Sequence, residues 1–383
     1  MLSRYNYRTM RIRAAAPALL FFAIFVTLHG LSQTEKVKPE QIDAIFQPLV
    51  AEGTPGFAVG VYREGKIVFA HGYGLSDLAL RVPISPRTDF RLASLTKQFT
   101  ATAIMLLAHD GKLSYDDPLT KVLPEFPAYG QKITIRQLLN HTSGLKDYED
   151  IYERETADIS PEKIAQLKDK DVLRIEEAQD STLFPPGSKW QYSNSGYAVL
   201  AMVVERVSGK PFGDFLKERI FQPLHMDATL AYEKGRNEVP NRAYGYRKNE
   251  TSGLWRFSDQ SPTSAVLGDG GVYTSLDDLA KWDDALSHFR LLSEAEMKAA
   301  WTPVDVAGGV QGPDGSASAY GFGWYLDAYK GHRRQWHYGE TIGFLNNIER
   351  LPDDKLTVVV LSNRVDIDPG ELAKKILELY LAK

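Results

Sequence analysis

The chain has 383 residues, of which 43% are hydrophobic and 25% are charged, and its formal net charge at pH 7 is −4. This balance is typical of a globular enzyme with a large buried core, and no basic face with interleaved aromatic residues indicates nucleic acid as a partner. Because the chain contains no cysteine, disulfides and thiolate chemistry are excluded.

The N-terminus has the layout of a secretory signal peptide. Four arginines fall within the first 13 residues, and an apolar run follows from Ala14 to Val26. Gly30 and Ser32 occupy the −3 and −1 positions of a cleavage site that would end a signal peptide at residues 1–32. The alternative is an uncleaved anchor, since about 18 apolar residues are the lower limit for a spanning helix. Either way we expect a periplasmic or secreted protein that touches a membrane only through such an anchor.

The elements that follow, taken in chain order, predict an α+β fold. A helix is expected over 36–52, followed by hairpin strands at 57–61 and 67–70 and a helix from residue 94. The region 113–301 is expected to be mostly helical, and 308–318 to be a surface loop. Capping patterns begin helices at residues 134, 275 and 293, and a helix over 195–208 ends at a glycine. Strands at 320–328, 334–338, 344–351 and 356–361, then a final amphipathic helix at 372–380, close the chain. Sequential hairpins imply antiparallel pairing.

A serine and a lysine at the start of the helix near residue 94 form the first candidate site. Ser94 lies in the first turn, where free backbone N–H groups and a partial positive charge favour an oxyanion. Lys97 lies three residues on and over the same face, within reach of the hydroxyl as a proton acceptor. The pattern alone is loose, because Ser160 and Lys163 repeat it at what reads as an ordinary helix start.

A rigid loop with two prolines and a glycine carries the second candidate pair. Tyr192 and Asn194 stand just before the helix expected over 195–208. A lysine ammonium nearby would lower the pKa of the tyrosine phenol from about 10 and allow it to shuttle protons. Asn194 can bond a substrate amide and the lysine together. A packed tyrosine beside an N-capping Asn194 is the alternative.

A strand near the C-terminus carries the third group. Gly339 allows the backbone to approach a ligand closely, and the amide of Glu340 can serve as an oxyanion donor. His337 is expected to face the pocket, although a lone histidine on a strand is more often structural.

These three groups in this order resemble the serine β-lactamase and penicillin-binding protein superfamily. The similarity is greatest to the class C β-lactamase-like branch, which includes D-amino-acid peptidases and esterases, and it runs from about residue 42 to the C-terminus. Each motif is weak alone, but together they are specific. The residues that carry the resemblance are 94–97 (Ser-Leu-Thr-Lys), 192–194 (Tyr-Ser-Asn), 337–339 (His-Tyr-Gly), and the stretches 133–145, 268–275 and 320–324.

The resemblance implies a β-lactamase/transpeptidase-like fold with an antiparallel sheet, flanking helices and a second, mainly helical lobe. The sheet lobe would come from about 34–115 and 305–383, the helical lobe from about 116–304, and the site would lie between them. By the same resemblance, the acylated nucleophile would be Ser94, and the residues that transfer protons would be Lys97 and Tyr192. Asn194 would contact the substrate amide. The oxyanion hole would consist of the N–H groups of Ser94 and Glu340, beside Gly339, and His337 would be a further catalytic residue.

The chain departs from the β-lactamase pattern at His337, where most β-lactamases of this superfamily have lysine. A histidine with a pKa of about 6.5 is mostly neutral at pH 7 and anchors a substrate carboxylate less well. The class A pattern Ser-Asp-Asn and its deacylating glutamate motif are also missing. These departures favour an esterase or peptidase over an efficient β-lactamase.

We therefore expect an exported serine hydrolase that forms an acyl-enzyme on ester or amide substrates, such as D-amino-acid peptides, peptidoglycan-like fragments or β-lactams. A penicillin-binding sensor that acylates without turnover is the first alternative, and a non-catalytic scaffold is the second. The spacing of the eight histidines gives no zinc motif, so we expect neither a metal nor another cofactor.

Overall fold

The structure, a computed structural model, describes residues 37–159, 164–313 and 315–382. The predicted signal peptide at 1–32 and the second Ser-x-x-Lys copy at 160–163 lie outside the described residues. Val37–Lys383 form one compact unit. Among the described residues, no helix combines the length and the apolar character that crossing a bilayer requires.

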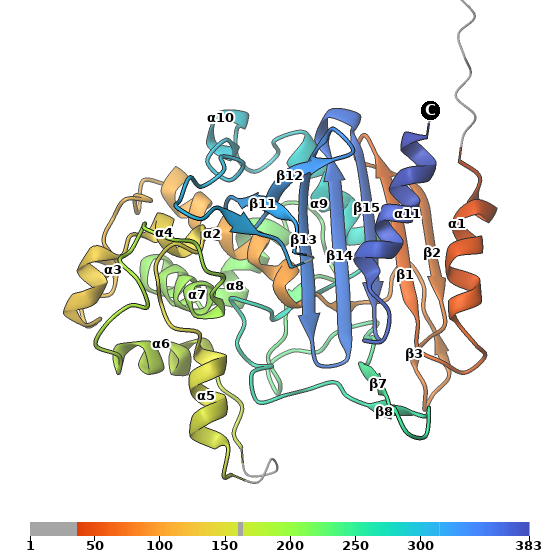
Figure 1. Cartoon of the computed structure of the whole chain (residues 1–383), viewed down its shortest axis with the longest axis horizontal. Helices are drawn as coiled ribbons and strands as arrows, with labels where there is room; N and C mark the ends of the chain where they lie inside the picture. The colour runs from red at the N-terminus through yellow and green to blue at the C-terminus, as the bar shows by residue number, and fades with distance from the viewer. Residues whose placement is uncertain (1–36, 160–163, 314, 383) are drawn as a thin grey trace, which may run out of the picture. The chain divides into compact units, whose positions relative to one another are not determined.

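A large antiparallel sheet lies at the centre of this unit (Figure 1). In the part of the chain that the structure describes, eight strands pair in the order β10-β11-β12-β13-β14-β15-β1-β2. The first and last strands of the chain meet where β1 pairs with β15, so both chain ends build one sheet. The strands are β1 (Phe57–Arg63), β2 (Lys66–Tyr73), β10 (Val310–Gln311), β11 (Ala317–Tyr320), β12 (Tyr325–Tyr329), β13 (His332–Thr341), β14 (Phe344–Leu351) and β15 (Leu356–Ser362).

Both faces of this sheet are covered, which explains why the residues of its middle strands are buried on both sides. In β1, Val59 and Val61 pack in a cluster with the helices α1 (Pro39–Phe46) and α11 (Pro369–Leu381), whereas Tyr62 packs in the main core on the other face. Since successive side chains of a strand point to opposite faces, a run of buried residues requires a layer on each side. Figure 1 shows α1 and α11 side by side on one face.

The opposite face is covered by α9 (Leu276–Ser287). Buried polar contacts hold this helix on the sheet. The carboxylate of Asp283 in this helix accepts hydrogen bonds from Arg350 (Nε to Oδ1, 2.8 Å) and Thr357 (Oγ1 to Oδ1, 2.7 Å). A buried charge needs such partners, so the helix is fixed against β14 and β15. This helix falls within the range 116–304 that the resemblance assigns to the helical lobe, yet it packs on the sheet.

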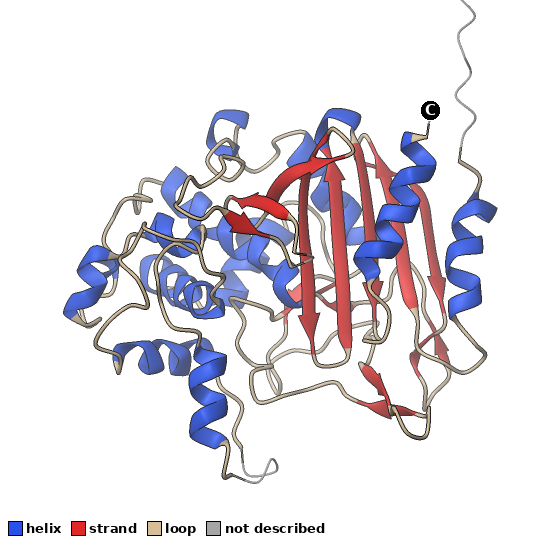
Figure 2. Ribbon diagram, viewed as in Figure 1, coloured by secondary structure: helices blue, strands red, loops and turns tan. Residues whose placement is uncertain are grey.

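Most of the remaining helices form a second group beside the sheet (Figure 2). The longest of them, α7, ends as the sequence predicts, with Gly209 at φ 71°, a left-handed conformation that glycine adopts without a steric penalty. These helices are α2 (Lys97–His109), α3 (Leu119–Val122), α4 (Ile135–Leu139), α5 (Tyr148–Thr156), α6 (Asp169–Glu177), α7 (Asn194–Ser208), α8 (Phe212–Leu216) and α10 (Glu294–Met297). Short helical turns occur along the whole chain, at η1 (Gln47–Leu49), η2 (Ala93–Thr96), η3 (Ala128–Lys132), η5 (Lys217–Phe221) and η6 (Pro352–Asp354).

Very short strands connect the two groups. Arg91 pairs with Tyr273 where β5 (Phe90–Arg91) runs antiparallel to β9 (Val272–Thr274). The residues that follow β5 therefore lie beside those that precede β9. The main-chain N–H of Leu92 donates to the carbonyl of Val272 (2.9 Å). The other short strands are β3 (Leu75–Asp77), β4 (Val82–Pro83), β6 (Leu230–Ala231), β7 (Tyr246–Lys248) and β8 (Trp255–Phe257).

Several sequence expectations are confirmed and three are corrected. The strand at 344–351 and the capped helix starts at residues 134, 275 and 293 are found as predicted. The helix expected over 36–52 is shorter, because α1 gives way to the turn η1. The strand expected at 320–328 is two strands, β11 and β12, joined by a turn at 321–324. The loop expected at 308–318 contains β10 and the start of β11.

Candidate active site

Ser94 lies in η2, directly after β5, and is the least buried residue of that turn. Its neighbour Ala93 has φ 51°, an uncommon conformation for a residue with a side chain. Strained backbone of this kind is held in place only by the packing around it, and it clusters at functional sites. The turn therefore presents the Ser94 hydroxyl in a fixed direction, toward a pocket.

Lys97 is fully buried, and its ammonium has three oxygen acceptors. Its Nζ lies 3.1 Å from the Oγ of Ser94, 2.8 Å from Oδ1 of Asn194 and 3.0 Å from the main-chain oxygen of Asp269. Burial lowers the pKa of Lys97 to about 8, although the charge of Asp269 and those of other nearby carboxylates oppose this shift. A lysine poised to lose its proton near neutral pH, in contact with a serine hydroxyl, can act as a general base.

Tyr192 lies beside the same two residues, but its pKa moves in the direction opposite to the sequence expectation. The ring centroid is 4.8 Å from Nζ of Lys97, and the phenol hydrogen-bonds to Ser94. Burial nevertheless raises the pKa of Tyr192 above its ordinary value, more than the hydrogen bond to Ser94 lowers it. The expected lowering is wrong, because desolvation disfavours the phenolate. Tyr192 therefore stays protonated and is suited to donate a proton.

Asn194 is the first residue of α7 and not its cap. The cap is Ser193, whose Oγ accepts from the N–H of Gly196 (3.2 Å), so the expected alternative of an N-capping Asn194 is wrong. The amide of Asn194 bridges the site: Oδ1 accepts from Lys97, and Nδ2 donates to Oε2 of Glu149 (3.1 Å). Asn194 and Glu149 both line the pocket beside Ser94.

His337 lies behind the site and does not face the pocket as the sequence suggested. Its Nδ1 donates to the carbonyl of Tyr338 (2.7 Å), and its Nε2 is 3.0 Å from the hydroxyl of Tyr320. Burial lowers the pKa of His337 to about 3, so the ring is neutral. With both nitrogens engaged and a ring centroid 6.2 Å from that of Tyr192, His337 supports the wall of the site. It supplies no charge to a substrate.

Gly339 and Glu340 bring the edge of β13 against the turn that carries Ser94. A Cβ added at Gly339 would lie 2.3 Å from the carbonyl oxygen of Leu92, so only glycine allows this approach. Glu340 lines the same small pocket as Ser94. The sequence-predicted residues other than His337 therefore converge on one place.

We expect Gly339→Ala to reduce kcat on an ester substrate by about 10²-fold, because the added methyl pushes β13 away from Ser94 and misplaces the amide of Glu340. Gly213 in α8 is a matched control, since a Cβ there would meet nothing closer than 3.4 Å. Steady-state kinetics and thermal melts of both alanine variants check this. Equal losses of activity in the two variants would show that the close approach at Gly339 is unimportant.

The pocket itself is small and carries carboxylates. Its volume is about 50 Å³, which holds only a few water-sized groups, so a substrate would insert only its reacting end. Arg91 is the one arginine that lines it, and its guanidinium group is engaged in hydrogen bonds to Ser264 and to the carbonyl of Gly270. The lining residues are Arg91, Ala93, Ser94, Tyr148, Glu149, Asn194, Thr263, Asp269, Gly270, Glu340 and Thr341.

Sequence reasoning missed four residues around this pocket: Tyr148, Glu149, Asp269 and His141. The buried His141 accepts a hydrogen bond from the N–H of Ser193 at Nδ1 (3.2 Å), and its ring centroid lies 4.4 Å from that of Tyr192. In the sequence, His141 and Asp269 stand out only as members of the stretches 133–145 and 268–275, which resemble other proteins. Nothing local in the sequence indicates that their polar side chains meet at Ser94.

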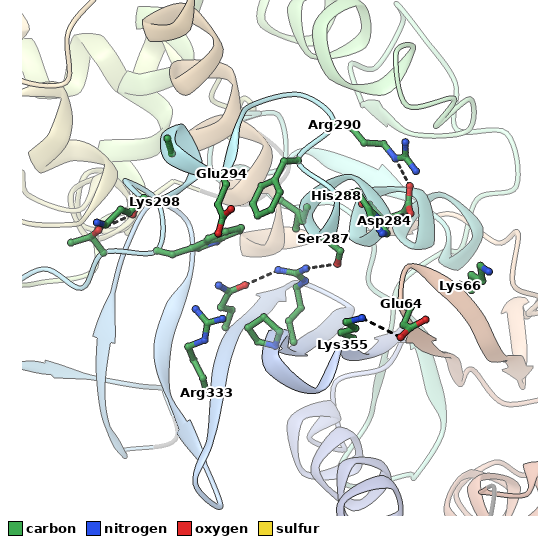
Figure 3. Close-up of a pocket in the computed structure, with 18 of the residues that line it drawn as sticks. Glu64, Lys66, Asp284, Ser287, His288, Arg290, Glu294, Lys298, Arg333 and Lys355 are labelled. Carbon is green, nitrogen blue, oxygen red and sulfur yellow. Dashed lines mark hydrogen bonds and ion pairs between the residues drawn. The ribbon is translucent and has the colours of Figure 1, made fainter. Parts of the chain in front are cut away.

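A second, larger cavity of about 1070 Å³ lies elsewhere, where α9 and α10 approach the hairpin ends of the sheet. Figure 3 shows that some of its charged groups face one another, with Lys355 directed at Glu64 and Arg290 at Asp284. None of the sequence-predicted site residues lines it. Among the described residues there is also no cluster of three or more His, Asp or Glu side chains able to hold a metal ion.

The sheet, the covering helices and the serine–lysine pair together define a hydrolase of the β-lactamase fold. The chain belongs to the beta-lactamase family, whose family model matches residues 42–382.

Relatives of known name include penicillin-binding protein 4* of Bacillus subtilis, 32% identical over 337 residues that cover 85% of this chain and 72% of the relative. A D-aminopeptidase of Gluconobacter oxydans is 26% identical over 313 residues, covering 81% of this chain and about half (56%) of the relative. Among solved structures, the octameric penicillin-binding protein homologue from Pyrococcus abyssi has a TM-score of 0.76 at 25% identity and covers 90% of this chain and 76% of that one. The D-amino acid amidase from Ochrobactrum anthropi SV3 has a TM-score of 0.74 at 25% identity and covers 90% and 98%.

Proposed function

We propose that this protein is an exported serine hydrolase that forms an acyl-enzyme on Ser94 and cleaves the amide or ester bond of small D-amino-acid derivatives. The observation that carries the proposal is the 3.1 Å contact between Nζ of Lys97 and Oγ of Ser94 at the wall of a pocket. Export rests on the N-terminal sequence pattern alone. The names of the D-aminopeptidase and D-amino acid amidase relatives support the substrate class.

The chemistry follows from the protonation states of the site. Neutral Lys97 accepts the proton of the Ser94 hydroxyl while Oγ attacks the substrate carbonyl carbon, and the carbonyl oxygen becomes an oxyanion held by the N–H groups of Ser94 and Glu340. Protonated Tyr192 donates its proton to the leaving amine or alkoxide as the bond to the carbonyl carbon breaks, and is reprotonated from Lys97. Water then attacks the Ser94 ester, giving the free acid and restoring the hydroxyl.

The charge of the pocket supports a substrate with a free ammonium group over one with a carboxylate. Glu149 and Asp269 line the pocket, whereas His337, where β-lactamases place a lysine, is neutral and buried. Desolvation, with the charges of Asp269 and Asp147, raises the pKa of Glu149 to about 7. The attraction of Glu149 for an ammonium group therefore grows as the pH rises through 7, where this carboxyl group ionises.

We expect Glu149→Gln to lower kcat/KM by about tenfold to a hundredfold on D-amino-acid amides with a free α-amino group, because a charge-assisted hydrogen bond is lost. The N-acetylated form of the same amide is the control, and its kcat/KM should change far less. The two substrates would be assayed side by side on wild type and variant. An equal loss on both would mean that Glu149 only orients Asn194 and does not select for the ammonium group.

The same assays separate the proposed hydrolase from a penicillin-binding sensor, which the names of several relatives bring into consideration. A hydrolase releases product continuously from an ester or D-amino-acid amide. A sensor would be labelled stoichiometrically by penicillin and would release nothing. Labelling without turnover on every substrate would overturn the proposal.

A further inference from the structure

Asp269 is a buried carboxylate at the site to which the reaction described above assigns no part. It is 7% exposed and lies in the turn that leads into β9. Its main-chain oxygen accepts a hydrogen bond from Nζ of Lys97 (3.0 Å), and Oδ2 of its carboxylate accepts from the hydroxyl of Tyr148 (2.8 Å). Asp269 thus contacts Lys97 through its main chain and also lines the pocket of Ser94.

The turn that carries Asp269 is held rigidly. The carboxylate of Asp169 accepts from the N–H groups of Leu267 (2.9 Å) and Gly268 (2.8 Å), and the carbonyl of Gly268 accepts from Oγ1 of Thr100 (2.6 Å). A Cβ at Gly268 would lie 2.3 Å from the carbonyl oxygen of Tyr197, so the turn sits directly on α7. This support fixes where the carboxylate of Asp269 stands relative to Lys97.

We propose that Asp269 is a positioning residue for Lys97: its carbonyl aims the ammonium at Ser94, and its carboxylate supplies the counter-charge that sets how readily the lysine gives up its proton. The proposal rests on the function inferred above, in which neutral Lys97 is the base. Among the charges around Lys97, that of Asp269 has the largest effect on its pKa and raises it against the lowering by burial.

Other titratable groups also face Lys97 and must be considered in a pH experiment. They are Asp147 and Glu149 at the start of α5, His141 after α4, Tyr192 before α7, Tyr197 in the first turn of α7, and His337 on β13. Arg91 acts in turn on Asp269. Both histidines have lowered pKa values and stay neutral above acidic pH. Burial raises the pKa of Glu149 and that of Asp269 to about 7, so these two carboxyl groups ionise just below the pH at which Lys97 loses its proton.

The test is the rate at which a fluorophosphonate labels Ser94, measured by mass spectrometry from acidic to alkaline pH. The rate should rise with pH as Lys97 loses its proton, with a midpoint near its pKa of about 8. In Asp269→Asn the counter-charge is gone and the lysine is more easily neutralised. We expect the rise to move to lower pH by about one unit, and the plateau to fall because the base is weaker.

Two further variants keep the experiment decisive. Asp169→Asn loosens the same turn without removing the charge beside Lys97, and should lower the rate without moving the midpoint. Tyr148→Phe removes the hydrogen bond that favours the ionised form of Asp269, and should move the midpoint in the same direction as Asp269→Asn but less. This variant replaces Asp269→Asn if the latter does not fold.

If the pH midpoint of labelling in a folded Asp269→Asn variant, or in Tyr148→Phe if that variant takes its place, were the same as in wild type, the inference would be overturned and the proposed function would stay intact. A midpoint that moved equally in Asp169→Asn would also overturn it, since the effect would then be structural. No labelling of wild type at any pH would remove the proposed function, and this inference with it.

Discussion

Replacing Ser94 by alanine should abolish hydrolysis of every ester and amide substrate, with kcat falling by about 10⁴-fold or more. The reason is that the covalent step has no other nucleophile: Ser94 Oγ is the hydroxyl that both Lys97 and Tyr192 contact. What activity remains would come from the oxyanion donors and from substrate binding alone. Continuous assay of a p-nitrophenyl ester of a D-amino acid measures the loss.

The control for this variant is its stability. Ser94 is only half-buried and its side chain is small, so the thermal midpoint of Ser94→Ala should stay within a few degrees of wild type. Ser143 is a matched serine, buried in the loop after α4 and outside the pocket. Ser143→Ala should keep most of the activity. If Ser94→Ala retained more than a tenth of wild-type kcat, the assignment of the nucleophile would be wrong.

Lys97 gives the second large effect, and two substitutions separate its two roles. We expect Lys97→Met, which is similar in length but has no nitrogen, to lower kcat by about 10³-fold to 10⁴-fold, as for loss of a general base. Lys97→Arg keeps the positive charge but cannot be deprotonated, because the pKa of arginine exceeds 12. If Lys97 acts as the base, both variants lose activity to a similar degree.

A different outcome would point to a different base. If Lys97→Arg kept more than a tenth of the activity while Lys97→Met did not, then positive charge would suffice and Tyr192 would be the proton acceptor. That result would contradict the raised pKa of Tyr192, which argues that this phenol stays protonated. Thermal melts of both variants are needed, since the fully buried ammonium satisfies the oxygens of Asn194 and Asp269.

The sequence predicted those parts of the fold that depend on local patterns. The capping serines and threonine marked helix starts, and β14 was found with its correct bounds because the turn residues Gly343 and Pro352 flank it. It could not predict β5 and β9. These strands have two and three residues, too few for a periodic pattern, and they pair across about 180 residues of chain. Yet their pairing is what brings Ser94 to the turn that carries Asp269.

The chemistry of the site also separates into features that local sequence predicts and features that depend on the folded structure. Spacing along one helix was enough to place Lys97 beside Ser94, since residues three apart share a face. The pKa of Tyr192 was predicted in the wrong direction, because the expectation counted the nearby lysine and could not count burial. His337 was expected on the pocket surface for a related reason: its partners, Tyr320 and the carbonyl of Tyr338, are fixed only by the folded sheet.

The role of Ser94 as the acylated nucleophile can be tested by intact-protein mass spectrometry of the wild-type protein after mixing with a fluorophosphonate and, separately, with a penicillin, followed by peptide mapping. We expect a single fluorophosphonate adduct on Ser94 that is absent from Ser94→Ala, in a protein that also turns over a D-amino-acid ester. Penicillin should be inert or stay bound. A fluorophosphonate adduct on another residue, or no adduct in a protein that still hydrolyses the ester, would contradict the account.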